Sequence, residues 1–211
     1  MKKVLFVAAT EGEAAPFKDH GLAVVRSGVG KVNAAVATVM ALERGTFDAV
    51  VSVGVAGSLP GSGLTPGAVV VADRVVYAEE GMSTSDDFLS IDAMGFPLAS
   101  FIKDNAARCE EALVASLASR IEGARTGAIA TVATCSANDE LAQEIAKRTG
   151  ALAEAMEGAA VVHAAGLIGV PAGELRVISN LTGERSRQQW DLQGALKILD
   201  RVAGVLASDS S

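Results

Sequence analysis

Three polar side chains stand where the sequence could support chemistry: Glu13, Glu157 and Asn180. Glu157 sits among Ala, Met, Gly and Val, and a carboxylate in such company is rarely buried without a partner; sugar hydroxyls would be suitable donors. Asn180 ends an apolar run, where a buried amide needs hydrogen-bond partners. Glu13 follows the first predicted strand, near the edge where open α/β sheets bind ligands. The alternative for Glu13 is a solvated carboxylate in a turn.

The glycines near residue 30 do not make a phosphate loop. Such a loop needs a glycine five residues before the Gly30-Lys31 pair and Ser or Thr after it, but Val25 and Val32 occupy these positions. Asn33 stands where a dinucleotide fingerprint would carry its third glycine. Residues 28–31 therefore predict a tight turn that leads into a helix.

Histidine and cysteine are too scarce and too far apart to predict a metal site, and we expect no cofactor. His20 and His163 are the only histidines, and His163 falls in an Ala- and Val-rich segment typical of a core or interface position. Cys109 and Cys135 lack metal-ligand spacing. We interpret them as free thiols in a reducing cytosol, which predicts a cytoplasmic protein.

Composition bounds the class of protein. A chain of 211 residues that is 50% hydrophobic can bury a sizeable core without disulfides. We expect one domain over residues 1–207 and a frayed tail over 208–211. The net charge of −7 and the lack of a basic cluster argue against a nucleic-acid partner. No run approaches about 18 apolar residues, so no membrane-spanning helix is expected.

Short β-branched runs alternate with helical patterns, and this alternation predicts an α/β fold: a three-layer αβα sandwich around a mixed, mostly parallel sheet. Several runs are apolar throughout, as is typical of strands covered on both faces. The predicted strands are residues 3–9, 22–26, 49–53, 68–77, 126–132, 151–155 and 175–178. The predicted helices are residues 32–44, 105–120, 138–149, 158–168 and 191–207.

Residues 79–97 are too many and too polar for a simple connection between two elements. Loops of this length in compact domains are often lids or binding loops.

Four short motifs give the chain a family resemblance over nearly its whole length: residues 27–35 (SGVGKVNAA), 53–58 (VGVAGS), 156–160 (MEGAA) and 176–180 (RVISN). Their order and spacing resemble those of the purine nucleoside phosphorylase and nucleosidase family. Within it, residues 78–97 are similar to the corresponding segment of the futalosine hydrolases. Asn180 points the same way, because methylthioadenosine/S-adenosylhomocysteine nucleosidases carry Asp there.

The resemblance implies an enzyme that hydrolyses futalosine to hypoxanthine and dehypoxanthinyl futalosine, in menaquinone biosynthesis. It also implies a homodimer or larger homo-oligomer. By resemblance, Glu13 holds the attacking water, Glu157 binds the ribose hydroxyls, and Asn180 faces the N7/O6 edge of the purine. The remaining residues that it implies for substrate binding are Ala56, Gly57, Phe88, Thr134, Cys135, Ser136, Met156, Arg176 and Ser179. Phe88 is the candidate for stacking on the 5′ extension of the substrate, and Arg176 either orients Glu157 or forms a structural ion pair.

Three alternatives stay open. A purine nucleoside phosphorylase would need a cationic phosphate pocket, and the acidic segment 11–13 is unfavourable for one. A methylthioadenosine/S-adenosylhomocysteine nucleosidase is disfavoured by Asn180. A catalytically silent nucleoside-binding protein on the same fold would not need both Glu13 and Glu157.

Overall fold

A mixed sheet forms the centre of the computed structural model, which describes residues 3–85 and 87–208. Of the predicted tail 208–211, Ser208 is the last residue of the final helix, and residues 209–211 lie outside the described residues. The strands are β1 (Val4–Ala8), β2 (Val24–Arg26), β3 (Ala49–Ser58), β4 (Val69–Tyr77), β5 (Gly81–Ser83), β6 (Phe88–Ser90), β7 (Ile102–Lys103), β8 (Ala106–Arg108), β9 (Arg125–Thr131), β10 (Ala153–Ala155) and β11 (Ala172–Leu181). The helices are α1 (Glu11–Asp19), α2 (Lys31–Arg44), α3 (Glu111–Arg120), α4 (Asp139–Thr149), α5 (Gly158–Ile168), α6 (Leu192–Ser208) and the 3₁₀ turn η1 (Arg185–Arg187).

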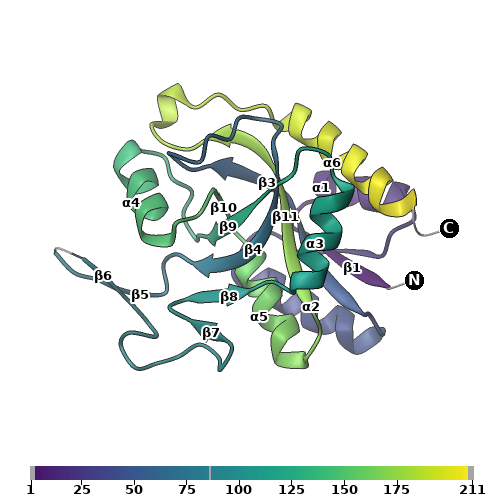
Figure 1. The fold of residues 1–211 in the computed structure, drawn as a ribbon, viewed down its shortest axis with the longest axis horizontal. Helices are drawn as coiled ribbons and strands as arrows, with labels where there is room; N and C mark the ends of the chain where they lie inside the picture. Colours follow the sequence, from purple (N-terminus) through teal and green to yellow (C-terminus); the bar gives the residue numbers. More distant parts are fainter. Residues whose placement is uncertain (1–2, 86, 209–211) are drawn as a thin grey trace.

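Helices cover both faces of the sheet, as the alternating pattern predicts (Figure 1). Helices α2 and α5 pack together on one face, where small residues of α5 join the larger apolar cluster. Helices α1, α3 and α6 cover a second apolar cluster on β1, β3 and β11, while α4 packs on β9. The three-layer α/β prediction is therefore confirmed.

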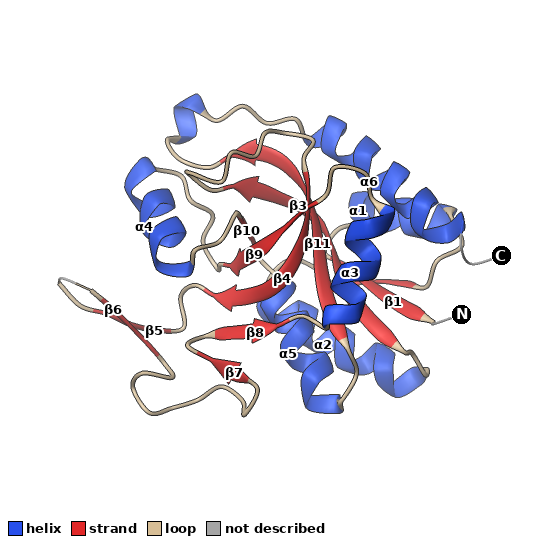
Figure 2. Cartoon of the chain, viewed as in Figure 1, coloured by secondary structure: helices blue, strands red, loops and turns tan. Residues whose placement is uncertain are grey.

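The sheet order holds one feature that hydrophobic periodicity does not predict. Strand β11 pairs with both β3 and β4, and β4 is linked through β9 and β10 back to the end of β3. These pairings close a ring of five strands (Figure 2). The ring brings the ends of β3, β10 and β11 together, although more than ninety residues separate β3 from β10 in the sequence.

The structure differs from the predicted elements at several places: β3 and β11 are longer than predicted, and two further differences bear on the site. Residues 106–108, predicted as helical, form β8 and pair with β4, so the helix begins only at Glu111. Helix α1 was not predicted, yet Thr10 and Glu13 form a capping box at its start. This pattern is a recognised helix start signal, and it places Glu13 in the first helical turn rather than in a loop.

The start of α5 lies against β11 with no room for a side chain. A Cβ atom at Gly158 would approach the Oε2 of Glu174 to 1.9 Å. Glu174 is fully buried on β11. Glycine is therefore required at the point where α5 begins, directly after Glu157.

We expect Gly158→Ala to lower the free energy of unfolding by about 1–3 kcal/mol, because the added methyl group overpacks a buried contact. Urea denaturation measures the change. Gly12→Ala in α1 is the matched control: its nearest neighbour would be a flexible Leu196 methyl at 3.6 Å, so it should leave stability unchanged or raise it. Equal stability of Gly158→Ala and the wild type would contradict the close contact.

Candidate active site

A pocket opens where the carboxyl ends of several strands meet. It is lined by the residues after β1, the end of β3, the segment after β9, the residues flanking β10 and the end of β11. This is the edge at which open α/β sheets bind ligands. The pocket contains ten of the twelve residues predicted for the site, namely Glu13, Ala56, Gly57, Cys135, Ser136, Met156, Glu157, Arg176, Ser179 and Asn180.

Glu13 is held rigidly by three hydrogen bonds. Its Oε2 accepts from the backbone N–H of Thr10 at 3.0 Å and from the Thr10 hydroxyl at 2.8 Å. Its Oε1 accepts from the backbone N–H of Val55 at 2.9 Å. The carboxylate is buried and still reaches the pocket. It is therefore a structured acceptor, and the solvated-turn interpretation of Glu13 is wrong.

Glu157 lies in the N-cap position of α5 and lines the same pocket. Its Oε1 accepts from the backbone N–H of Gly30 at 3.0 Å, and its Oε2 accepts from Nη2 of Arg176 at 3.2 Å. The predicted turn at residues 28–31 thus does more than start α2: Gly30, with φ of 95°, directs a backbone donor at the pocket carboxylate.

Arg176 is buried between the carboxylates of the site. Its Nε donates to Glu174 at 2.8 Å, and Nη2 donates to the Ser52 hydroxyl at 2.9 Å as well as to Glu157. Burial by itself would lower the pKa of the guanidinium, but Glu174, Glu157 and Glu13 together raise it above its ordinary value. Arg176 therefore stays charged. It contacts Glu157 and also forms a buried ion pair with Glu174, so the structure is compatible with both of the roles considered from sequence.

Glu174, the second acidic partner of Arg176, is an acid that sequence analysis missed. Burial raises the pKa of this carboxyl, while the neighbouring Arg176 opposes the shift. Glu174 alternates with apolar residues along β11. An exposed strand position shows the same pattern, so the sequence does not reveal that Glu174 is buried.

Gly54 allows these groups to approach one another. A Cβ atom at this position would lie 2.3 Å from Oε1 of Glu13 and 2.6 Å from Nη1 of Arg176. The backbone of β3 therefore runs directly beneath the two charged groups, and a larger residue would push them apart.

Asn180 lies at a bulge in β11, where the register to β3 shifts between Ile178 and Asn180. A bulge re-aims a side chain, and here it directs the amide into the pocket. The Ser179 hydroxyl lies 2.9 Å from the amide Oδ1, and Nδ2 donates to the carbonyl of Leu181 at 3.3 Å. One Nδ2 hydrogen is left for a ligand.

Glu154, Gln188 and Trp190 also line the pocket and were not predicted. Glu154 on β10 accepts from the backbone N–H of Ser136 at 2.8 Å and from its hydroxyl at 2.6 Å. Burial raises the pKa of this carboxyl, and the two hydrogen bonds from Ser136 oppose the shift. Sequence analysis assigned the motif around Glu157 and overlooked Glu154, which stands only three residues before it.

Two predicted residues lie outside the pocket lining. Thr134 is exposed beside Cys135. The centre of the Phe88 ring lies 4.1 Å from the guanidinium carbon of Arg148 on α4, so its stacking on a ligand stays a prediction that this arrangement does not support. Residues 79–97 carry the β5–β6 hairpin, which projects from the body of the molecule (Figure 1). A cation–π contact with α4 holds the Phe88 ring there.

The positions of His163 and the two cysteines agree with their interpretation as a core or interface histidine and two free thiols. The His163 ring lies 3.1 Å from the Tyr77 hydroxyl and contacts the edge of Phe101, outside the pocket. Cys109 and Cys135 are free thiols, the first buried and the second exposed. Among residues 3–85 and 87–208, no group of three or more His, Cys, Asp or Glu side chains could hold a metal ion. No helix in the same part of the chain has the length and apolarity to cross a membrane.

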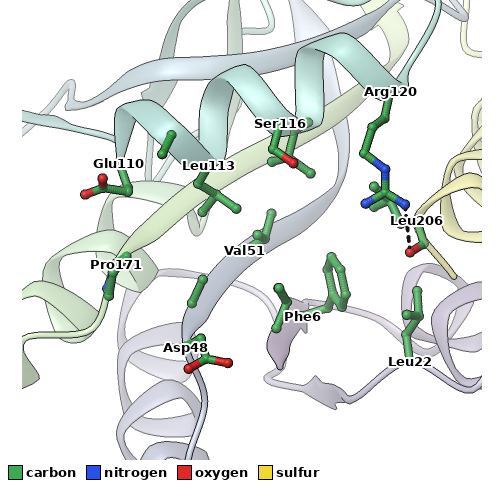
Figure 3. A pocket seen from close by; sticks show the side chains of 14 residues that line it. Phe6, Leu22, Asp48, Val51, Glu110, Leu113, Ser116, Arg120, Pro171 and Leu206 are labelled. Carbon is green, nitrogen blue, oxygen red and sulfur yellow. Dashed lines mark hydrogen bonds between the residues drawn. The ribbon is translucent and has the colours of Figure 1, made fainter. Parts of the chain in front are cut away.

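A second cavity of about 420 Å³ lies at the opposite, amino-terminal ends of β1, β3 and β11 (Figure 3). Its walls are mainly apolar, with Phe6, Val51 and Leu113 facing the space. Its one guanidinium, on Arg120, donates to the carbonyls of Val205 and Leu206. We assign the chemistry to the pocket that holds Glu13 and Glu157, because the polar groups expected of a reaction site converge there.

Comparison with known proteins agrees with this geometry. The family model described as "Phosphorylase superfamily" matches residues 6–208. The chain belongs to the phosphorylase superfamily. The futalosine hydrolase of Streptomyces coelicolor is 36% identical over 197 residues, which cover 89% of this chain and 79% of the relative. The 5′-methylthioadenosine/S-adenosylhomocysteine nucleosidase of Bacillus subtilis is 28% identical, over 88% of this chain and 79% of the relative.

A solved structure shares the same fold. It is the 5′-methylthioadenosine/S-adenosylhomocysteine nucleosidase of Neisseria meningitidis in complex with methylthio-immucillin-A, with a TM-score of 0.81 and 23% identity. The match covers 99% of this chain and all of that one. As a superfamily member with nucleosidase and hydrolase relatives, the protein is an N-ribohydrolase.

We expect Arg176→Met to lower the free energy of unfolding by about 3–5 kcal/mol, because it leaves Glu174 and Glu157 buried without their cation. Chemical denaturation measures the loss. The double variant Arg176→Met/Glu174→Gln should be less destabilised than the sum of its single variants, since it also removes a stranded charge. Strict additivity would show that the two residues are not coupled. Arg187→Met removes an exposed ion pair with Asp139, and serves as the control with little expected change.

Proposed function

We propose that the protein hydrolyses the N-glycosidic bond of futalosine, releasing hypoxanthine and dehypoxanthinyl futalosine. The observation that carries the proposal is the convergence of Glu13, Glu157 and Asn180 on one pocket. The chain's 36% identity to a protein named futalosine hydrolase supports the choice of substrate.

Cleavage of an N-glycosidic bond passes through a ribosyl cation. A carboxylate near the developing charge stabilises this state more than the ground state, which lowers the barrier. Glu157 binds the ribose hydroxyls in this proposal, and its orientation by Gly30 and Arg176 costs no reorganisation during the reaction. Met156, which lines the same wall, packs on the sugar.

Glu13 holds and polarises the attacking water. Its three donors, from Thr10 and Val55, fix the carboxylate while a lone pair remains directed at the pocket. General-base assistance of this kind contributes about 10²–10⁴-fold to a rate.

Water is favoured over phosphate as the nucleophile. Arg176 is the one cation among the described residues that line the pocket, and its N–H groups are directed at Glu174, Glu157 and Ser52. The carboxylates of Glu13, Glu157 and Glu154 would repel a phosphate anion. The nearby Lys31 forms ion pairs with Glu79 and Glu80. These pairings disfavour the phosphorylase alternative.

Asn180 stabilises the leaving base by hydrogen bonding rather than by proton transfer. Its amide does not titrate, but the remaining Nδ2 hydrogen can donate to N7 or to O6 of hypoxanthine, both of which are acceptors. Adenine presents a 6-amino donor that faces this group unfavourably. The methylthioadenosine/S-adenosylhomocysteine nucleosidase alternative is therefore disfavoured.

We further propose that the enzyme acts in menaquinone biosynthesis in the cytoplasm, without a metal or cofactor, as a homodimer or larger homo-oligomer. An exposed apolar stripe on α2 supports the assembly: Val32 is 78% exposed, Val36 51% and Met40 43%. Their i, i+4, i+8 spacing places them on one face, and a contiguous patch of this kind is a typical interaction surface.

The wild-type enzyme should release hypoxanthine from futalosine at the same rate with and without phosphate, and should release little adenine from methylthioadenosine. Glu13→Gln should lower kcat by about 10²–10⁴-fold, because it removes the base that polarises water. Glu11→Gln is the matched control two residues away; Glu11 is exposed and bound to Lys18, so its replacement should leave kcat unchanged. A strict need for phosphate would overturn the hydrolase assignment.

Asn180→Asp should lower kcat/KM for futalosine by about 10-fold or more, because an ionised carboxylate repels the O6 and N7 acceptors of hypoxanthine. The same variant should raise the relative rate on methylthioadenosine, since Asp can pass a proton to N7. Paired rates on the two nucleosides, followed by chromatography of the released base, measure the shift. An unchanged ratio would remove Asn180 from base selection.

A further inference from the structure

Lys31 is a cation at the unfavourable end of its helix. It is the first residue of α2, and the first turn of that helix carries no acidic residue. The helix dipole places partial positive charge at this end, so a lysine there is destabilising unless nearby acids compensate it. The side chain is also largely withdrawn from solvent, with 22% of it exposed. Helix formation by itself therefore does not account for a lysine at this position.

Two acids that directly precede the β5–β6 hairpin, Glu79 and Glu80, compensate this charge; we call them the hairpin base. The Nζ of Lys31 donates to Oε1 of Glu80 at 2.6 Å and lies 3.8 Å from Oε2 of Glu79. The two acid side chains are shielded about as well as the lysine, at 24% and 27% exposed. Ion pairs that are partly withdrawn from water are screened much less than pairs on an open surface.

The hairpin base is anchored in turn to the body of the protein. Nδ2 of the buried Asn105 donates to the backbone carbonyl of Glu80 at 2.5 Å. The carboxylate of Glu79 accepts from the backbone N–H of Ala133, two residues before Cys135 of the pocket lining. The lysine is therefore bound to a fixed point and not to a freely moving loop.

The residue before Lys31 reaches the carboxylate that is proposed to face the sugar. The backbone N–H of Gly30 donates to Oε1 of Glu157 at 3.0 Å. Gly30 is the N-cap of α2 and has no side chain of its own to brace the turn, so the direction of its N–H depends on its neighbours. Asn33 braces the turn from one side, by donating to the carbonyl of Val29 at 2.8 Å. Lys31 connects the other side to the hairpin base.

We propose that Lys31 is a positioning residue for the reaction proposed above. Its ion pairs with the hairpin base hold the Gly30 amide against Glu157 and so keep that carboxylate directed at the sugar. Arg176 donates to Oε2 of Glu157 at 3.2 Å, and the lysine network supplies the matching constraint on Oε1. The inference rests on the proposed nucleosidase function and adds to it a residue that acts without touching the substrate.

The expected effect is on the rate rather than on binding of the base. A carboxylate that can rotate loses part of its stabilisation of the ribosyl cation, because preorganised charge is what lowers the barrier. Misplacement of a reacting group by about 1 Å can cost about 10²-fold. Lys31→Met should therefore lower kcat on futalosine by about 10- to 100-fold. Free hypoxanthine has no ribose to contact Glu157, so its affinity should be unchanged.

The test combines steady-state rates on futalosine with calorimetric binding of hypoxanthine, for the wild type, Lys31→Met and Lys31→Arg. Lys31→Arg keeps the charge and should recover most of the lost rate. Lys18→Met is the matched control, because it removes another Lys–Glu pair, with Glu11, that is more exposed and lies outside the pocket lining. Its kcat should equal that of the wild type.

A double-mutant cycle separates positioning from general support of the fold. Lys31→Met should cost little further rate in a Glu157→Ala background, because the group that it positions is already gone. An equal fold-loss in both backgrounds would overturn the proposal. So would a parallel loss of rate and of hypoxanthine affinity in Lys31→Met, which would leave the lysine as a support for the pocket wall beyond Ala133.

A second variant covers the case in which Lys31→Met does not fold. Glu80→Met removes the 2.6 Å contact and leaves the lysine in place. It should lower kcat in the same selective way, with hypoxanthine affinity unchanged. A wild-type kcat in Glu80→Met would overturn the proposal.

The wild-type rate on futalosine separates this inference from the proposed function. Release of hypoxanthine by the wild type, together with an unchanged kcat in Lys31→Met, would leave the reaction in place and remove only the role of Lys31. Absence of release by the wild type would remove the reaction and with it the basis of the inference.

Discussion

The buried guanidinium of Arg176 is the interaction on which the active site depends. Three carboxylates, on Glu13, Glu157 and Glu174, lie within its field, and such a concentration of buried negative charge could not persist without a cation. Glu174 and Ser52 hold the guanidinium from the sheet side, and its Nη2 then orients Glu157. One residue thus stabilises the acids electrostatically and sets the position of the Glu157 carboxylate. Because its N–H groups are engaged, it offers little to an incoming anion, which fits a water-dependent reaction.

Close backbone approach is the second constraint, and glycine provides it at three places around the pocket. Gly54 lets Glu13 and Arg176 meet over β3, Gly158 lets α5 begin against Glu174, and Gly57 lets the side chain of Thr182 pack against β3. Each of these contacts would be shorter than 3 Å with a Cβ atom present. Glycine in this chain therefore allows close backbone packing around the pocket, in addition to its use in turns.

The closed ring of strands explains how distant segments form one site. Strand β10 has only three residues, but it joins the end of β3 to β9 and so carries Glu154, Met156 and Glu157 to the edge where β11 delivers Asn180. The bulge before Asn180 turns its side chain into the pocket at that edge. Together these features make one pocket that is lined by Glu154 and Glu157 from the β10 side and by Asn180 from the β11 side.

Local sequence determined the layer architecture, the position of most helices and the principal acids. Apolar periodicity predicts α2, α4, α5 and α6 because burial of one helix face is a local pattern, and short motifs single out Glu157 and Asn180. Helix α1 was within reach of sequence analysis, since its capping box is local.

Tertiary structure alone decided the rest. Residues 106–108 became β8 through pairing with β4, Phe88 was held on α4 by Arg148, and Glu154 and Glu174 became site residues through strand register. The physical reason is that pairing and charge compensation act between residues far apart in the chain, and no local pattern encodes them.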